Sequence, residues 1–282
     1  MKVRKRDGTI ADFESSKVVG SLKNSGVSEE GIKKVLSKIK EKNFSMISTD
    51  KLYSLIYKLV EKYENKYNAS IYSLKNAILR LGPDGYNFED FIAKIFQLLK
   101  YDVKVRQVYP SMCINHELDV VGKNFFIECK YHNSGGITTG IKEVMYSHSR
   151  FRDLKNANKE KGYDFQKFWV ASNTKFSQDC IDYAEYWSIN LMGWKYKGEM
   201  SLSYLIDQNN WYPITLLPSV SRRIFEILKR NSVLIITDLK FNGDSNLKKM
   251  GLNDKEIAVL RMDYDNLIKA SEKIKKKNGL NP

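Results

Sequence analysis

The sequence predicts a multi-domain α/β protein, and three observations lead to that class. The chain has 282 residues, enough for two or three domains. Extended runs alternate with amphipathic helices in residues 83–212, whereas the segments on either side are mostly helical. Charge follows the same division, since residues 1–82 carry 17 basic and 9 acidic side chains, residues 83–212 carry 16 of each, and residues 213–282 carry 14 and 8. We therefore place domain boundaries after residues 82 and 212.

Composition excludes several classes of protein. With 13 Phe, 17 Tyr and 4 Trp, the chain is too aromatic to be disordered. No run approaches the roughly 20 apolar residues of a membrane helix, and the basic start lacks the apolar stretch of a signal peptide. The 3 cysteines are widely spaced, which disfavours a disulfide framework or a zinc ribbon. We expect a cytoplasmic protein with no membrane partner.

The first segment, residues 1–82, is expected to form a hairpin and four helices. The run from Val3 to Phe13 predicts the hairpin, with Asp7-Gly8 as a turn dipeptide that tolerates positive φ. Four stretches with apolar residues at helical spacing follow, each opened by a residue that can cap a helix: Ser15 or Ser16, Ser28, Thr49 or Asp50, and Ser70.

The hairpin motif Val3-Arg4-Lys5-Arg6-Asp7-Gly8, with Phe13 and Lys17 behind it, resembles that of the ATP-cone domain, a nucleotide-sensing module. The hairpin and four helices match that family's layout. The resemblance implies that ATP or dATP binds here, with Val3 at the base or ribose and Lys5, Arg6 and Lys17 at the phosphates. Arginine offers a fork and lysine a point charge for phosphate. The alternative is that the run Arg4–Arg6 is solvated or touches DNA.

The middle segment, residues 83–212, is expected to form a mixed sheet with helices on its faces. The pattern predicts helices and strands in the order helix 88–100, strands 103–109, 117–121 and 124–131, helix 141–155, strand 167–171, helix 178–186 and strand 189–193.

Two acidic residues and a lysine stand on neighbouring strands of this segment. Alternate residues of a strand share a face, so Glu128 and Lys130 should point the same way, and the hairpin should set Asp119 beside Glu128. Two carboxylates that can share a metal, with an amine in reach, suit phosphodiester hydrolysis. The bare pattern of an acid, any residue and a lysine recurs at Glu64, Asp102, Asp153 and Asp238, but only Glu128 follows an apolar strand one hairpin after another acid.

These strands resemble the PD-(D/E)xK nucleases, within them the Mrr-type restriction endonucleases. The matching motifs are Gly85-x-x-Phe88-Glu89, Leu118-Asp119-Val120-Val121 and Glu128-x-Lys130. The resemblance implies Mg²⁺ or Mn²⁺ held by Asp119 and Glu128, with Lys130 orienting or deprotonating the attacking water and offsetting charge. Glu89 would complete the metal shell or bind a second ion, or else only stabilise the start of its helix. The implied substrate is double-stranded DNA and the implied role is defence.

The last segment, residues 213–282, is expected to be helical, either as a plain helical packing extension or as a possible DNA contact. Basic amphipathic helices are predicted here, and one stretch is weakly similar to a helix-turn-helix unit. The tail Lys273–Lys277 is expected to be solvated, or to contact DNA nonspecifically.

Taken together, these patterns predict a metal-dependent DNA endonuclease, regulated by ATP or dATP, in a homo-oligomer that is a dimer or tetramer. The alternative is a nucleotide-responsive DNA-binding regulator whose nuclease fold is not catalytic.

Overall fold

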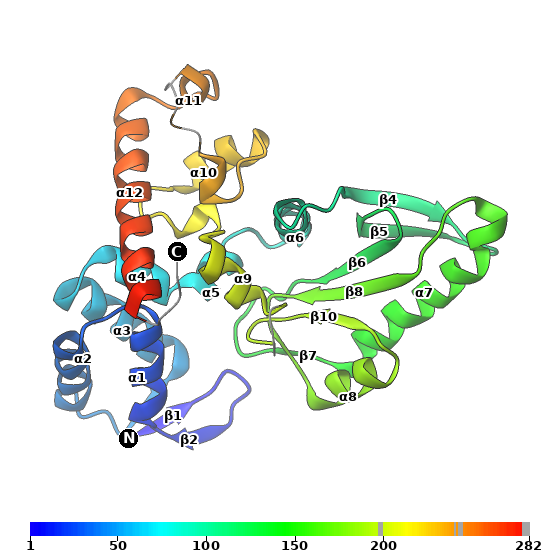
Figure 1. Cartoon of the computed structure of the whole chain (residues 1–282). Helices are drawn as coiled ribbons and strands as arrows, with labels where there is room; N and C mark the ends of the chain where they lie inside the picture. The colour runs from blue at the N-terminus through cyan, green and yellow to red at the C-terminus, as the bar shows by residue number, and fades with distance from the viewer. Residues whose placement is uncertain (197–199, 240, 242–244, 278–282) are drawn as a thin grey trace. The chain divides into compact units, whose positions relative to one another are not determined.

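The computed structural model describes residues 1–196, 200–239, 241 and 245–277 (Figure 1). The chain divides into two compact units, one formed by Met1–Ala77 with Tyr212–Pro282 and the other by Ile78–Trp211. The first and third segments of the sequence-based division thus share one unit. Strands and helices occur in both units, so the protein has a multi-domain α/β fold.

A small sheet opens the first unit. It contains β1 (Lys2–Arg4), β2 (Ile10–Asp12) and β3 (Met46–Ser48) in the order β2-β1-β3. The predicted hairpin is confirmed, because β1 and β2 pair antiparallel and Gly8 at the turn has φ +85°. The third strand pairs parallel with β1 and was not predicted. With three residues, it depends on that distant partner rather than on its own pattern.

Helices pack against this sheet around one apolar core. They are α1 (Ser15–Asn24), α2 (Glu29–Glu41), α3 (Thr49–Tyr63), α4 (Lys66–Tyr72) and α5 (Leu74–Leu79). The predicted start of the fourth helix at Ser70 was wrong. The helix begins at Lys66, because the side chain of Asn65 accepts hydrogen bonds from the backbone N–H groups of Tyr67 and Asn68.

The carboxyl-terminal part of this unit is helical, as predicted. It contains short 3₁₀ turns at Ile214–Leu216 and Ile236–Asp238, then α10 (Arg222–Arg230), α11 (Ser245–Lys249) and α12 (Asp254–Lys277). The last helix packs against α4. Lys273–Lys277 was expected to be a solvated tail. These residues instead form the carboxyl-terminal end of α12, and Lys275 is buried.

A five-stranded mixed sheet forms the centre of the second unit. Its strands are β4 (Lys104–Pro110), β5 (Asn115–Val121), β6 (Phe125–Lys130), β8 (Lys167–Ser172) and β10 (Asn190–Met192), in the order β10-β8-β6-β5-β4. The first three pair antiparallel, and β8 and β10 extend the sheet in parallel. Two short strands, β7 (Thr138–Thr139) and β9 (Lys175–Phe176), pair separately.

Helices cover both faces of this sheet, as Figure 1 shows. On one face lies α6 (Tyr86–Leu98), whose Phe96 ring contacts those of Phe125 and Trp169. The other face packs against α7 (Ile141–Lys161) and α8 (Gln178–Tyr186), with Phe126, Phe168 and Val170 in the shared core. A further helix, α9 (Leu202–Asn209), follows β10. The predicted mixed sheet with helices on both faces is confirmed.

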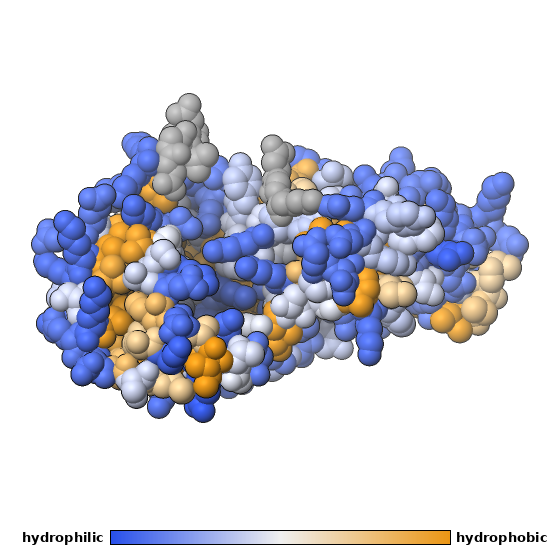
Figure 2. Space-filling model, turned by 90° about the horizontal axis from the view of Figure 1, so that it is seen from below, coloured by the Kyte–Doolittle hydropathy of each residue, from blue (hydrophilic) through white to orange (hydrophobic). Residues whose placement is uncertain are grey.

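Most of the face drawn in Figure 2 is hydrophilic, and its hydrophobic residues lie in several separate groups. Among the described residues, none of the helices combines the length and the apolar character needed to cross a membrane.

Candidate functional site

The predicted acidic site lies where the β5–β6 ladder ends. The last registered pairs are Val121 with Phe126 and Val120 with Ile127. Beyond them Asp119 comes next on β5, and its Oδ2 accepts a hydrogen bond of 2.6 Å from the backbone N–H of Cys129. The carboxylate therefore occupies the place of a strand-to-strand bond, and its position is fixed by backbone rather than by a flexible side chain.

Glu128 and Lys130 point to the same side of β6, as predicted, and this side faces α7. Lys130 Nζ donates to Glu128 Oε1 at 2.8 Å. From α7, Arg150 Nη1 donates to Glu128 Oε2 at 2.5 Å. The Glu128 side chain is 5% exposed, so this carboxylate is buried between two cations.

Burial and neighbouring charges shift the pKa values of Asp119 and Lys130. Burial raises the pKa of Asp119 to about 7, helped by the neighbouring charge of Glu128 and opposed by the hydrogen bond from Cys129. For Lys130, burial lowers the pKa, but the carboxylate of Glu128 outweighs it and the net shift is upward. The lysine is therefore held as an ammonium ion that donates hydrogen bonds. Of its predicted roles, orienting water and offsetting charge fit this state better than deprotonating water does.

Glu89 lies in the first turn of α6 and is engaged by an arginine. Its Oε2 is 3.2 Å from Arg106 Nη1, and the same guanidinium donates to Asp90 at 2.7 Å. Burial raises the pKa of Glu89 despite Arg106, and Glu89 in turn contributes to the raised pKa of Asp119. Arg106 has φ +51° at the β4 position between the paired residues Val105 and Gln107. The backbone thus leaves strand geometry where it passes Asp119.

The donors at this site fit a hard divalent cation in kind, although they do not form a complete cage. Within the described ranges, no three His, Cys, Asp or Glu side chains are grouped so as to hold a metal ion. Asp119 Oδ1 accepts no hydrogen bond from the described residues, and the charge on this carboxylate is opposed by burial and by Glu128. A cation would relieve both effects. Glu128 would have to share its oxygens with Lys130 and Arg150.

Three residues of α7 belong to the site and were not predicted. Arg150 binds Glu128, its Nη2 donates to the hydroxyl of Tyr146 at 3.1 Å, and Glu143 lies 3.8 Å from Lys130 Nζ. Their signal in the sequence is the spacing of 143, 146 and 150, which places them along one helix face. Nothing in the sequence indicated that this face would meet β6.

In the first unit, the hairpin residues predicted to bind a nucleotide are partly engaged by carboxylates. Arg6 binds Asp50 Oδ1 through Nε at 2.8 Å and through Nη2 at 2.6 Å. Lys17 Nζ pairs with Glu14 at 2.6 Å. Val3 is half-buried against the helical core, while Lys5 forms no ion pair with a described residue. Bound phosphates would therefore contact Lys5 and two cations, Arg6 and Lys17, that are already paired with carboxylates.

A hollow of about 360 Å³ lies along the start of α3 and includes Asp50, the partner of Arg6. Lys51, Ser54 and Lys58 also line it. The hydroxyl of Thr49 donates to the carbonyl of Arg4 at 3.3 Å, which ties the hairpin to this helix. The structure thus places Arg6 next to a recess with two further lysines.

Fold and site together define a two-unit α/β protein in which a buried glutamate, a half-buried aspartate and a lysine meet at the end of a strand ladder. No family model matches the chain. A protein of Archaeoglobus fulgidus, described only as uncharacterized, is 30% identical over 169 residues, which are 58% of this chain and 92% of that protein. The chain belongs to the same family as that archaeal protein.

A solved structure is also similar to this chain. It is the crystal structure of a protein of unknown function, AF1548, with 27% sequence identity and a TM-score of 0.51, and the match covers 68% of this chain and 98% of that one. Neither description assigns an activity.

Proposed function

We propose that this protein is a metal-dependent DNA endonuclease of the restriction type, regulated by ATP or dATP bound at its amino-terminal hairpin. The observation that carries the proposal is the arrangement of Asp119, Glu128 and Lys130 at the end of the β5–β6 ladder. Asp119 and Glu128 would hold Mg²⁺ or Mn²⁺, which when bound supplies positive charge against the scissile phosphate and lowers the pKa of a water molecule.

The chain's own residues would then position the reacting groups and stabilise the negative charge that develops on them. Lys130, kept cationic by Glu128, would donate to the attacking water or to a phosphate oxygen and offset the negative charge that develops there. Arg150 would hold Glu128 in place from α7. Glu89, already engaged by Arg106, would have a smaller part, so Glu89→Gln should slow cleavage less than Asp119→Asn does.

The test is cleavage of plasmid DNA by the full chain with Mg²⁺ or Mn²⁺, with and without ATP and dATP. Asp119→Asn and Lys130→Ala should each slow cutting by about a hundredfold or more. A matched control is Asp102→Asn with Lys104→Ala, which changes the same residue types in an exposed copy of the pattern and should leave the rate within about twofold. A wild-type protein that cuts under none of these conditions would reject the enzyme.

The nucleotide part of the proposal has a test of its own. Calorimetry should detect ATP or dATP binding to wild type, and Lys5→Ala with Arg6→Ala should weaken it, whereas Lys33→Ala with Lys42→Ala on exposed positions should not. Equal binding by both pairs of variants would place the nucleotide elsewhere.

A second candidate is a nucleotide-responsive DNA-binding regulator with a non-catalytic nuclease fold. One observation favours it: both oxygens of Glu128 are already bound, by Lys130 and by Arg150, as in a structural ion-pair network. Under this alternative, DNA binding would change with ATP or dATP while no strand is cut.

A further inference from the structure

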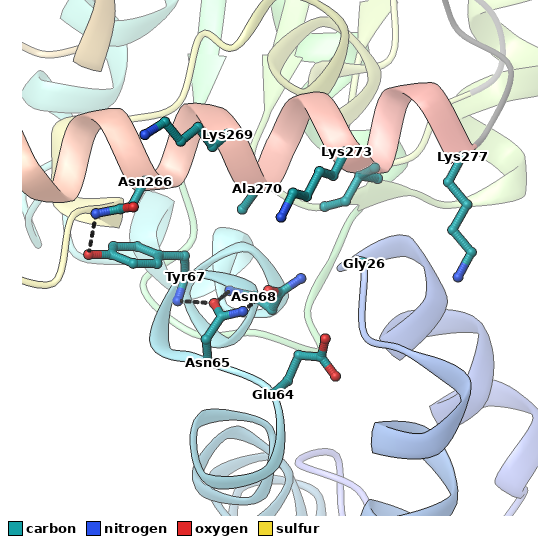
Figure 3. A pocket seen from close by; sticks show the side chains of 11 residues that line it. Gly26, Glu64, Asn65, Tyr67, Asn68, Asn266, Lys269, Ala270, Lys273 and Lys277 are labelled. Carbon is teal, nitrogen blue, oxygen red and sulfur yellow. Dashed lines mark hydrogen bonds between the residues drawn. The ribbon is translucent and has the colours of Figure 1, made fainter.

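A cavity of about 290 Å³ lies in the first unit between α4 and α12, and neither site described above includes it. Figure 3 shows its two walls. One is α12, which carries Lys269, Lys273 and Lys277; the other is the start of α4 with Asn65 and Asn68. Its size is at the lower end of the range for small-molecule sites.

The three lysines form a row along one face of α12. They are four residues apart, so each lies about 6 Å further along the helix axis than the one before. In Figure 3, Lys273 and Lys277 extend toward the opposite wall, and Lys269 runs along the helix. None of the three forms an ion pair with a residue that the structure describes. Like charges at this spacing destabilise a helix, and a bound anion would relieve the repulsion.

The opposite wall carries little charge to compensate the row. Glu64 is the one acidic residue among those lining the cavity, and its Oε2 already accepts from the backbone N–H and the hydroxyl of Ser28, at 3.1 and 2.8 Å. The side chain of Asn65 donates to that of Asn68, which donates to the carbonyl of Ser25 at 2.7 Å. The cavity therefore has a net positive charge.

The walls are held in place by contacts outside the lysine row. Asp263 of α12 accepts hydrogen bonds from Lys66 and Tyr67 of α4, and Asn266 donates to the hydroxyl of Tyr67. At Gly26, a Cβ atom would lie 2.4 Å from Ile274, so only glycine lets this loop approach α12 so closely. A site whose walls are fixed before binding loses less entropy when its ligand binds.

We propose that this cavity binds a linear oligophosphate, such as inorganic triphosphate or the triphosphate group of a nucleotide. A row of three lysines about 12 Å long is longer than a single phosphate requires, but it can surround a chain of linked phosphates. A DNA backbone would have to enter a recess rather than lie along an open face. The site is separate from the hairpin and does not depend on the proposed nuclease activity.

The experiment is calorimetry of the full chain with inorganic triphosphate and, separately, with ATP. The pocket variant carries Lys269→Gln, Lys273→Gln and Lys277→Gln. A charge-matched control carries Lys249→Gln, Lys255→Gln and Lys276→Gln, which lie on α11 and α12 but do not line the cavity. The background Lys5→Ala with Arg6→Ala removes the proposed hairpin site. In that background triphosphate should still bind, and the pocket variant should weaken it by about tenfold or more while the control does not.

The outcomes separate the possible ligands. Equal affinity for ATP and inorganic triphosphate means that the phosphate chain alone is recognised, and tighter ATP binding means that the nucleoside adds contacts; both support the site. Equal weakening in the pocket and control variants would overturn it, as would triphosphate binding that vanishes with the hairpin cations. If a short DNA duplex loses affinity in the pocket variant but triphosphate never binds, the row is a DNA contact and the proposal is wrong.

Discussion

Two aspartates, one buried in the first unit and one half-buried in the second, lie in opposite electrostatic surroundings. Asp263 in the first unit is 0% exposed, and donors reach both of its oxygens: Lys66 and Tyr67 at Oδ1, and the backbone N–H of Ser219 at Oδ2. Although burial raises its pKa, these partners outweigh burial and the net pKa is lowered. Asp119 in the second unit has one donor, the N–H of Cys129, and a neighbouring carboxylate, so its pKa is raised to about 7.

The difference separates a structural carboxylate from one that we propose to be functional. Asp263 is stabilised as an anion by its surroundings and so helps to hold α12 against α4. Asp119 is destabilised as an anion, which is a cost to folding that a site for a cation would explain.

The largest expected effect is on DNA cleavage. Asp119→Asn should lower the rate by about a hundredfold or more, because an amide is a poorer ligand than a carboxylate for Mg²⁺. Asp263→Asn should keep the rate per folded molecule within about threefold when no nucleotide is added. Plasmid nicking, normalised to the folded fraction from circular dichroism, measures both. Equal losses of cleavage rate in the two variants would show that the two aspartates do not differ in their importance for cleavage.

For the free energy of unfolding, the loss should occur in Asp263→Asn rather than in Asp119→Asn. Asp263→Asn should lower the free energy of unfolding by about 2–4 kcal/mol, because it removes the anion that Lys66 and the Ser219 N–H bind. Urea unfolding at pH 7 measures this loss. Asp265→Asn on an exposed position of the same helix is the control and should stay within about 0.5 kcal/mol. An unchanged midpoint for Asp263→Asn would show that the network adds nothing.

Asp119→Asn should change the free energy of unfolding in the opposite direction. At pH 8 in a chelator it should raise the free energy of unfolding by about 1–2 kcal/mol, because it removes a half-buried negative charge beside Glu128. Asn keeps an oxygen that can accept from Cys129. A clear destabilisation of this variant would mean that the carboxylate is a structural group after all.

The smallest effect is the pH dependence of these differences. The pKa of Asp119 is raised in the folded protein, so its cost to stability is absent below about pH 4 and grows until about pH 7. The pKa of Asp263 is lowered, so its contribution is present above about pH 4 and is lost as the pH falls further. Unfolding of wild type and both variants from pH 3 to 8 should show these opposite trends, and parallel curves would contradict them.

Local patterns in the sequence predicted much of the fold. The Asp7-Gly8 turn and the alternation in β6 depend on near neighbours, and the structure has both as predicted. One miss came from a contact between distant segments, and the other came from a local cap that the prediction overlooked. The strand at 46–48 exists through its pairing with β1, and the fourth helix starts earlier than expected because Asn65 caps it.

In the candidate site, too, local relations could be predicted from the sequence and contacts between distant segments could not. Glu128 and Lys130 could be placed on one face because they are two residues apart on a strand. Arg150 is 22 residues from Glu128 in sequence, and only the packing of α7 on the sheet brings them together. The sequence predicted that the lysines at the end of α12 are solvated, because it does not show that this helix forms a wall of a cavity.

Titration of Mn²⁺ into the metal-free protein, followed by calorimetry at pH 8, tests the central claim most directly, since it asks whether Asp119 is a ligand. Wild type should bind the ion, Asp119→Asn should weaken binding by about tenfold or more, and Asp263→Asn should leave it unchanged. If wild type binds no ion, or if Asp119→Asn binds as tightly as wild type, the Asp119 carboxylate is not a metal ligand and the proposed nuclease site is wrong.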